Sequence, residues 1–351
     1  MAFFSNKTKT IILSLIGLFI IVRLALPYIL LKYVNKALSD MDGYHGNVKD
    51  LDVALLRGAF TLKGLSIEKE NSNIPVPFLK LNEIELSIHW KALMDGAIVG
   101  EIIANEPIIN FAIDSTGEEA QTGVENNWVQ TLRNITPVEV NLNLVTINNA
   151  QIYYKDFSHS PIVDIYIKSF NLKATNLSNV VNQTEKLPAS IYAQGTSIGG
   201  GKLIFAANVN ILKPIPDFNA DFKLEDANLT SLNSFTEGYA NFDFEEGMFS
   251  LYSEMIMDNG VYDGYIKPIM TDINLIKKGS DKEKSIFNKG YQLFLDVISE
   301  VFENQKHNSF ATKSPISGNT NKTKVNVWVT IGNTLKNAFI KALPKKIDKE
   351  L

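Results

Sequence analysis

The segment Phe218-Asn-Ala-Asp-Phe-Lys-Leu-Glu225 decides the fold class of this chain. Its apolar residues, Phe218, Ala220, Phe222 and Leu224, occupy every second position, and polar or charged residues fill the positions between them. Successive side chains of a β-strand point to opposite faces of a sheet, whereas a helical pattern repeats every 3.6 residues. The segment therefore predicts a strand with one apolar face and one polar face.

The same alternation recurs along most of the chain after residue 44, for example at residues 84–90, 138–144, 163–168 and 325–331. Turn-forming residues separate the runs at Asp95-Gly96, Asn148-Asn149, Gly199-Gly-Gly201, Glu246-Gly247 and Asn259-Gly260. Strands joined by such short turns pair antiparallel, and no stretch has the strand–helix–strand spacing of a parallel nucleotide-binding sheet. We therefore expect a mainly β protein whose strands, roughly fourteen to sixteen in number, form a sheet some 70 Å long at about 4.8 Å per strand.

An apolar segment at residues 11–31 is long enough to cross a membrane, because twenty-one helical residues span about 31 Å. The only charge in it, Arg23, costs roughly 2.5–3.5 kcal/mol on insertion, and fifteen Leu, Ile, Val and Phe residues oppose it with about −7 kcal/mol. The anchor residues that we single out are Ile11, Leu15, Phe19, Val22, Arg23, Leu26 and Leu31.

A cleaved signal peptide is the alternative interpretation of this segment, but no small-x-small cleavage site follows it. We therefore expect an uncleaved anchor. Lys7 and Lys9 place the N-terminus in the cytoplasm and the body on the other side of the membrane, although Lys32 and Lys36 oppose that orientation.

The chain accordingly divides into three parts. Residues 1–38 form the cytoplasmic N-terminus and the transmembrane anchor, and residues 39–284 form the β body. Residues 285–351 hold an amphipathic helix at 285–303, a polar loop at 304–323, a final strand and a C-terminal helix. Only a few short helices are expected elsewhere.

Composition argues against several function classes. The chain has 351 residues, no cysteine, and 34 basic against 38 acidic residues, which argues against disulfides, thiol catalysis and a nucleic-acid partner. Its four histidines are scattered without ligand spacing, no GxSxG nucleophile motif occurs, and Gly195–Lys202 lacks the order of a phosphate-binding loop. We therefore expect no catalytic residues, no metal site and no cofactor, so the protein is predicted not to be an enzyme.

A long sheet with one continuous apolar face must cover that face. A second sheet, closure into a barrel, helices or a bound ligand would each do so, and periodicity does not choose among them. The residues that we expect on the apolar face are Ile84, Leu86, Ile88, Val138, Val140, Leu142, Leu144, Val163, Ile165, Ile167, Phe218, Phe222 and Leu224.

An ordered set of short motifs resembles one known family. After the apolar helix come Arg57-Gly-Ala-Phe-Thr-Leu-Lys-Gly-Leu-Ser-Ile, Leu86-Ser-Ile-His-Trp-Lys-Ala-Leu, Gly100-Glu-Ile-Ile-Ala-Asn-Glu-Pro, Thr136-Pro-Val, Ile147-Asn-Asn-Ala-Gln-Ile-Tyr-Tyr, Leu187-Pro-Ala, Glu246-Gly-Met-Phe-Ser-Leu and Gly260-Val-Tyr-Asp-Gly-Tyr. This order resembles the AsmA-like envelope proteins, in the branch catalogued as domain of unknown function 748. The family usually has an Asp-Gly turn where this chain has Asn148-Asn149.

The resemblance implies a curved β-groove anchored in the bacterial inner membrane and lying in the periplasm. It further implies that the residues singled out above bind phospholipid acyl chains, in support of phospholipid transport or of outer-membrane and envelope biogenesis, together with other envelope proteins. The alternative is a structural or assembly factor of the envelope whose apolar face is filled by its own side chains.

Overall fold

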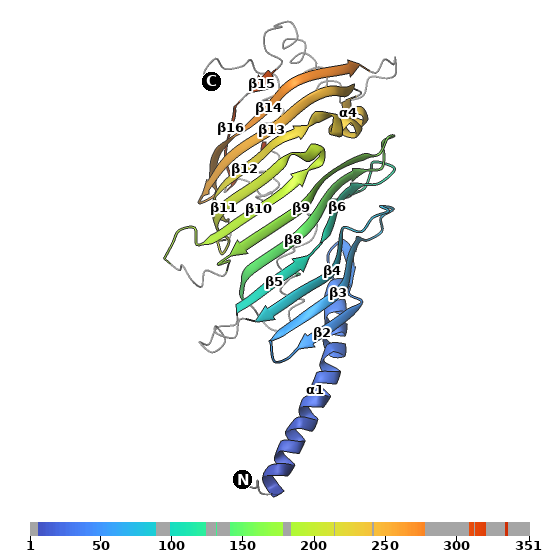
Figure 1. Ribbon diagram of the computed structural model, residues 1–351, viewed down its shortest axis with the longest axis vertical. Helices are drawn as coiled ribbons and strands as arrows, with labels where there is room; N and C mark the ends of the chain where they lie inside the picture. Colours follow the sequence, from blue (N-terminus) through green and yellow to red (C-terminus); the bar gives the residue numbers. More distant parts are fainter. Residues whose placement is uncertain are drawn as a thin grey trace.

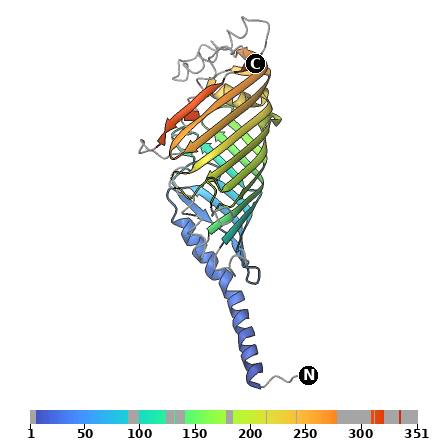
Figure 2. The same ribbon diagram turned by 90° about the vertical axis from the view of Figure 1, so that its left-hand side faces the viewer.

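The computed structural model describes residues 6–88, 99–123, 131, 141–177, 184–213, 215–240, 242–277, 309–311, 313–320 and 334–335. In these ranges the chain forms one long N-terminal helix and one large curved sheet, with short helices at its margin (Figures 1 and 2). The expectation of a mainly β protein with an N-terminal apolar helix, a long curved sheet and few short helices is confirmed.

Helix α1 runs from Asn6 to Ser39, and its lower half extends away from the sheet (Figure 1). Thr10–Ser39 is, in the described part of the chain, the one helix that is long and apolar enough to cross a membrane. The predicted anchor residues Ile11, Leu15, Phe19 and Val22 are exposed along it, and so is Arg23. Leu26 and Leu31 are partly buried, because the helix meets the sheet there.

In the described residues, sixteen strands form a single sheet, in the order β1-β3-β4-β5-β8-β9-β10-β11-β12-β13-β14-β15, with β2, β6, β7 and β16 at its sides. Their bounds are β1 Tyr44–Asn47, β2 Asp50–Ala54, β3 Ala59–Lys69, β4 Leu79–Ile88, β5 Val99–Asn105, β6 Ile108–Ile113, β7 Ala120–Gln121, β8 Asn141–Asp156, β9 Val163–Thr175, β10 Ala189–Ser197, β11 Lys202–Asn210, β12 Asp217–Asn228, β13 Phe242–Asp258, β14 Val261–Lys277, β15 Ser309–Ala311 and β16 Ser314–Asn319. The short helices are η1 Ile198–Gly200, η2 Leu229–Leu232 and α4 Asn233–Ala240.

Neighbouring strands are antiparallel except at β8, which runs parallel to β5 and to β6. Hairpin spacing did not predict this exception. Residues 114–140 connect β6 to β8, and a connection of this length can return the chain to the starting end of the sheet, which a tight turn cannot do.

Of the five predicted turns, two are hairpins, two are not, and Asp95-Gly96 lies outside the described residues. Gly199-Gly-Gly201 joins β10 to β11, and Asn259-Gly260 joins β13 to β14, as expected. Asn148-Asn149 lies inside β8 and Glu246-Gly247 lies inside β13, where the pairing register shifts. Asn149 and Gly247 have positive φ angles of 52° and 139°, so these residues form bulges that leave the strand continuous.

The predicted polar loop at 304–323 contains two strands, β15 and β16, which both pair with β14. Its Asn- and Ser-rich composition concealed them, although Ser314 and Ile316 alternate as buried residues with exposed neighbours. The predicted helix at 285–303, the strand at 325–331 and most of the C-terminal helix lie outside the described residues.

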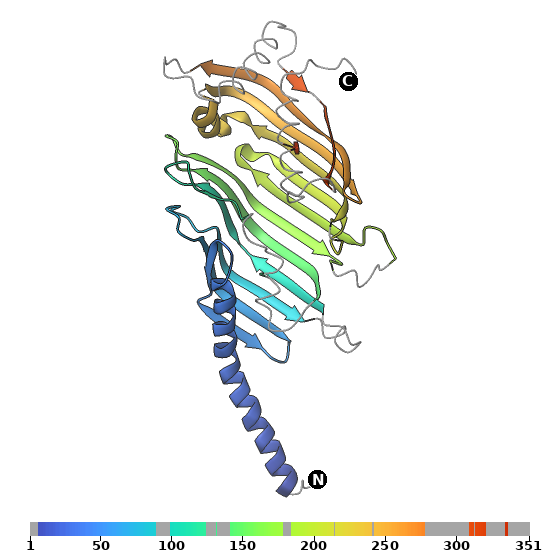
Figure 3. The same ribbon diagram turned by 180° about the vertical axis from the view of Figure 1, so that it is seen from behind.

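The upper half of α1 packs on one face of the sheet, over the strands nearest the N-terminus (Figure 3). Val34 and Leu38 of the helix are buried against Leu51, Leu62 and Ile84 of the sheet. We call the sheet face that carries these residues the inner face, and the opposite one the outer face. Helix α1 therefore covers one end of the inner face.

Leu62 is fully buried in this contact, with 0% of its surface exposed. Leu62→Ala removes apolar burial and leaves a cavity beneath α1, so we expect a loss of about 2–4 kcal/mol in the free energy of unfolding. Chemical unfolding of the detergent-solubilised chain, followed by circular dichroism, measures it. Ile204→Ala, on the outer face and 37% exposed, is the control and should cost much less; equal losses would contradict the assigned packing.

Candidate functional site: an apolar row across the inner face

One row of directly paired residues crosses the sheet on its inner face. The pairing register connects them in the order Leu62, Ile84, Ala104, Ile147, Leu172, Ala193, Phe205, Phe222, Ser253 and Ile266. At a strand spacing of about 4.8 Å, this inner row extends for roughly 43 Å. Nine of its members are apolar, so the apolar face that alternation predicts within each strand continues from strand to strand.

The adjacent row on the outer face is largely polar. It runs through Thr61, Glu85, Ile103, Thr146, Lys173, Tyr192, Ala206, Asp221, Glu254 and Tyr265. The inner and outer rows are offset by one residue in every strand. The bulges must therefore keep the apolar residues on the inner face where the pairing register shifts. A single uncorrected slip would exchange the apolar and polar faces over the rest of the sheet.

The inner row is covered at its ends more completely than in its middle. Leu62, Ile84 and Ala104 are buried in the core cluster to which Val34 and Leu38 of α1 also belong. At the other end Ile266 is buried in a second cluster with Phe218, Met257, Tyr262 and Ile316. Between these ends the small residue Ala193 is buried, whereas the larger Ile147, Leu172, Phe205 and Phe222 are only half-buried. The middle strands therefore keep apolar side chains that the described chain shields incompletely.

Most of the predicted apolar-face residues share the inner face. The register places these predicted residues there: Ile84, Leu86, Ile88, Leu142, Val163, Ile165, Ile167, Phe218, Phe222 and Leu224. Val138 and Val140 lie outside the described residues. The structure adds members that single-strand alternation did not single out, among them Ile147, Leu172 and Phe205, because only the pairing register shows which faces join.

Leu144 does not share that face, and its prediction is corrected here. The register shifts between Gly100 and Glu101, so that Leu142 pairs with Gly100 but Leu144 pairs with Glu101. Val145 takes the inner position instead and packs on the core cluster beneath α1. The run of residues 138–144 alternates regularly, so nothing in it signalled the irregularity.

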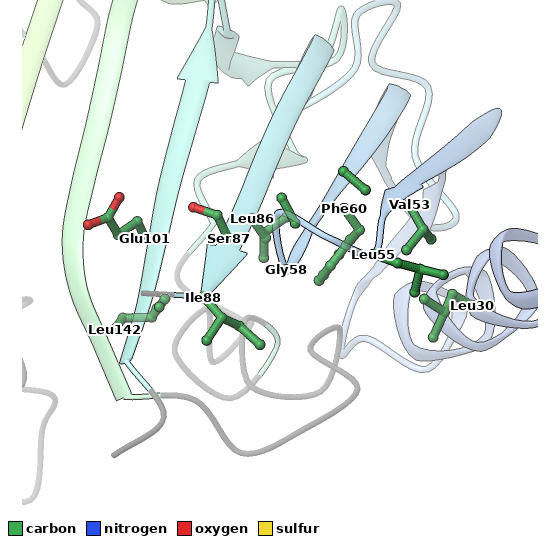
Figure 4. A pocket seen from close by; sticks show the side chains of 13 residues that line it. Leu30, Val53, Leu55, Gly58, Phe60, Leu86, Ser87, Ile88, Glu101 and Leu142 are labelled. Atoms are coloured by element: carbon green, nitrogen blue, oxygen red, sulfur yellow. The ribbon is translucent and has the colours of Figure 1, made fainter. Parts of the chain in front are cut away.

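A pocket of about 170 Å³ lies at the α1 end of the inner face (Figure 4). Leu30 of α1, Leu55, Phe60, Leu86, Ile88 and Leu142 contribute its apolar lining. A cavity of about 150 Å³ lined by aliphatic and aromatic residues can stay dry and bind a benzene-sized molecule. This pocket can therefore hold a short apolar segment, and two of the predicted residues, Ile88 and Leu142, are only partly buried there.

A polar cluster closes the far end of the β8–β9 hairpin. Asp156 is 1% exposed and accepts hydrogen bonds from Ser158 Oγ at 2.6 Å, from the Ser158 amide at 2.9 Å and from the Tyr239 hydroxyl. Tyr239 belongs to α4, and its hydroxyl also lies 2.6 Å from that of Tyr154. The cluster thus attaches α4 to β8 next to the inner face, and sequence reasoning did not find it because α4 carries no strong helical pattern.

Ser158, His159 and Asp156 lie together, but their geometry differs from that of a serine nucleophile relay. Ser158 Oγ and Asp156 Oδ2 both lie 3.1 Å from the same nitrogen, His159 Nδ1. A relay needs the serine on one ring nitrogen and the carboxylate on the other. In the part of the chain that the structure describes, no three His, Asp or Glu side chains are grouped to hold a metal ion.

Asp156 is ionised more readily than an ordinary aspartate. Burial alone raises its pKa, but the hydrogen bonds from Ser158, Tyr239 and His159 together outweigh burial and lower the pKa. A lowered pKa in the folded chain stabilises the fold above the ordinary aspartate pKa of about 4, and this contribution is lost as the pH falls through the folded pKa.

Asp156→Asn removes the negative charge to which Ser158, Tyr239 and His159 donate hydrogen bonds. We therefore expect the free energy of unfolding to fall by about 1–3 kcal/mol at neutral pH. The melting temperature of the parent chain should also fall more steeply than that of the variant between about pH 6 and pH 3. Thermal unfolding across this pH range measures both effects. Asp221→Asn, at an exposed position, is the control; a variant curve parallel to the parent curve would contradict the role of Asp156.

Comparison with known proteins gives no assignment. No family model matches the chain, and no curated protein matches it. The likeness to AsmA-like proteins therefore remains a prediction from the motifs.

Proposed function

We propose that this protein is anchored in the bacterial inner membrane by α1 and binds lipid acyl chains on the inner face of its sheet in the periplasm. It would thereby support phospholipid transport or envelope biogenesis. The observation that carries the proposal is the inner row, in which nine of ten strands contribute an apolar residue and the large apolar side chains in the middle are only half-buried.

The energetics favour an elongated apolar ligand. Each buried methylene contributes about 0.8 kcal/mol, so ten methylenes of one acyl chain laid along the row would contribute roughly 8 kcal/mol. Such binding needs no specific polar contact, because the headgroup can stay in water. The polar outer row fits this arrangement, since it leaves the other face of the sheet solvated.

The apolar helix supports the location of this binding. A chain that carries its own membrane span stays next to its source of lipid, and the pocket lined by Leu30 and Leu142 opens beside that span. Lys7 and Lys9 favour a cytoplasmic N-terminus against the opposing Lys32 and Lys36, and with that orientation the sheet would lie in the periplasm.

A structural or assembly factor with a self-filled inner face is the second candidate. The two buried clusters at the ends of the row favour it, because there the chain covers its own apolar residues. The half-buried middle distinguishes the two functions, and two adjacent residues of β11 test it. Phe205 is half-buried on the inner face, and Ile204 is 37% exposed on the outer face.

Phe205→Asp places a charge where acyl chains would lie, and Ile204→Asp places the same charge on the solvated face. We expect Phe205→Asp to lower co-purified phospholipid at least fivefold while the protein stays folded, and Ile204→Asp to change neither property. Lipid extraction with mass spectrometry, together with thermal unfolding, measures this.

Normal lipid content in folded Phe205→Asp protein would contradict lipid binding on this face. The self-filled alternative predicts a different result: Phe205→Asp unfolds, Ile204→Asp stays folded, and the parent protein carries no lipid. The reason is that a charge buried without a partner destabilises a closed core.

A further inference from the structure

The turn between β2 and β3 presents the most exposed large apolar side chain that the structure describes. Residues 55–58 form the turn, in which the Arg57 amide donates to the Ala54 carbonyl at 3.0 Å. Leu56 at its tip is 87% exposed. Its neighbour Leu55 lines the same pocket as Leu30 of α1, so the tip lies beside the helix, at the lower end of the sheet (Figures 1 and 4).

The helix fixes the level of this turn relative to a bilayer. A hydrocarbon core about 30 Å thick needs about twenty helical residues at 1.5 Å each, so an apolar span that begins at Ile11 ends near Leu30. The body, however, already contacts the helix at Leu26 and Leu30, which both pack on the core cluster. The lower margin of the body therefore begins roughly 6 Å before the apolar span ends.

This overlap requires the lowest part of the body to enter the bilayer surface. Segments that lie in the interface bury apolar side chains about 5–10 Å into the headgroup and acyl boundary, a depth that matches the overlap. The exposed side chains at the lower margin of the body are of types that favour a membrane–water interface. Leu56 offers apolar surface, the Arg57 side chain is 62% exposed, and Tyr28 and Tyr33 of α1 are 74% and 46% exposed.

We infer that the β2–β3 turn is a membrane-embedded element that inserts Leu56 into the bilayer leaflet next to the sheet. The turn and α1 then hold the body at two points, which fixes its orientation and sets the pocket at Leu30 and Leu55 against the acyl region. The partner is the lipid bilayer itself. This inference rests on α1 spanning the membrane and goes beyond lipid binding along the inner row, so either one can fail without the other.

The absence of cysteine from the chain permits a direct test. The variant Leu56→Cys is labelled with a polarity-sensitive fluorophore and reconstituted as the full chain into phosphatidylcholine–phosphatidylglycerol vesicles. Leu212→Cys is the matched control, because Leu212 is a 60% exposed leucine at the β11–β12 turn, and the strands β4, β5, β8, β9 and β10 lie between β3 and β11. Vesicles with and without brominated acyl chains are compared.

We expect the label at residue 56 to emit at shorter wavelength and to lose at least half of its intensity with brominated acyl chains. The label at residue 212 should change by less than a tenth. Equal, water-like emission without quenching at both positions would overturn the inference. A shielded label at residue 56 that brominated lipid does not quench would also overturn it, because the turn would then contact protein.

Discussion

The structure depends on the alternation of side chains between the two faces of a sheet. In each strand an apolar residue faces inward when its neighbours face outward, and pairing then joins the inward residues into the row from Leu62 to Ile266. The bulges preserve this order where strands gain a residue. Asn149 of β8 and Ser169 of β9 lie where the pairing register shifts, and both have positive φ angles. These local backbone conformations keep the apolar face continuous.

The apolar face in turn needs cover, and the chain supplies it unevenly. The upper half of α1 buries the row at Leu62 and Ile84, and the cluster around Tyr262 buries it near Ile266. The same helix is therefore both an apolar span and part of the core. Under the proposed anchoring, the position of the sheet relative to the membrane would follow from its packing on α1.

Much of this arrangement could be predicted from the sequence, because alternation and apolar length are local properties. The N-terminal helix and the strand-rich body are found as expected. Ten of the thirteen predicted apolar-face residues lie on the inner face. Leu144 was misassigned, since a register shift depends on the partner strand and leaves no trace in a regular run. The parallel pairing of β8 was missed because it depends on contacts between distant segments. The strands within residues 304–323 were missed because their composition is polar, and the Asp156–Tyr239 cluster because α4 has no strong helical pattern.

The proposed function requires that lipid lies on the middle of the inner row. Site-specific photo-crosslinking in intact membranes tests it most directly, with a benzophenone side chain placed at Phe222 on the inner face or at its neighbour Lys223 on the outer face of β12. We expect a phospholipid adduct, identified by mass spectrometry, at residue 222 and none at residue 223. Crosslinks from residue 222 that form only within the chain, or equal lipid adducts from both positions, would contradict it.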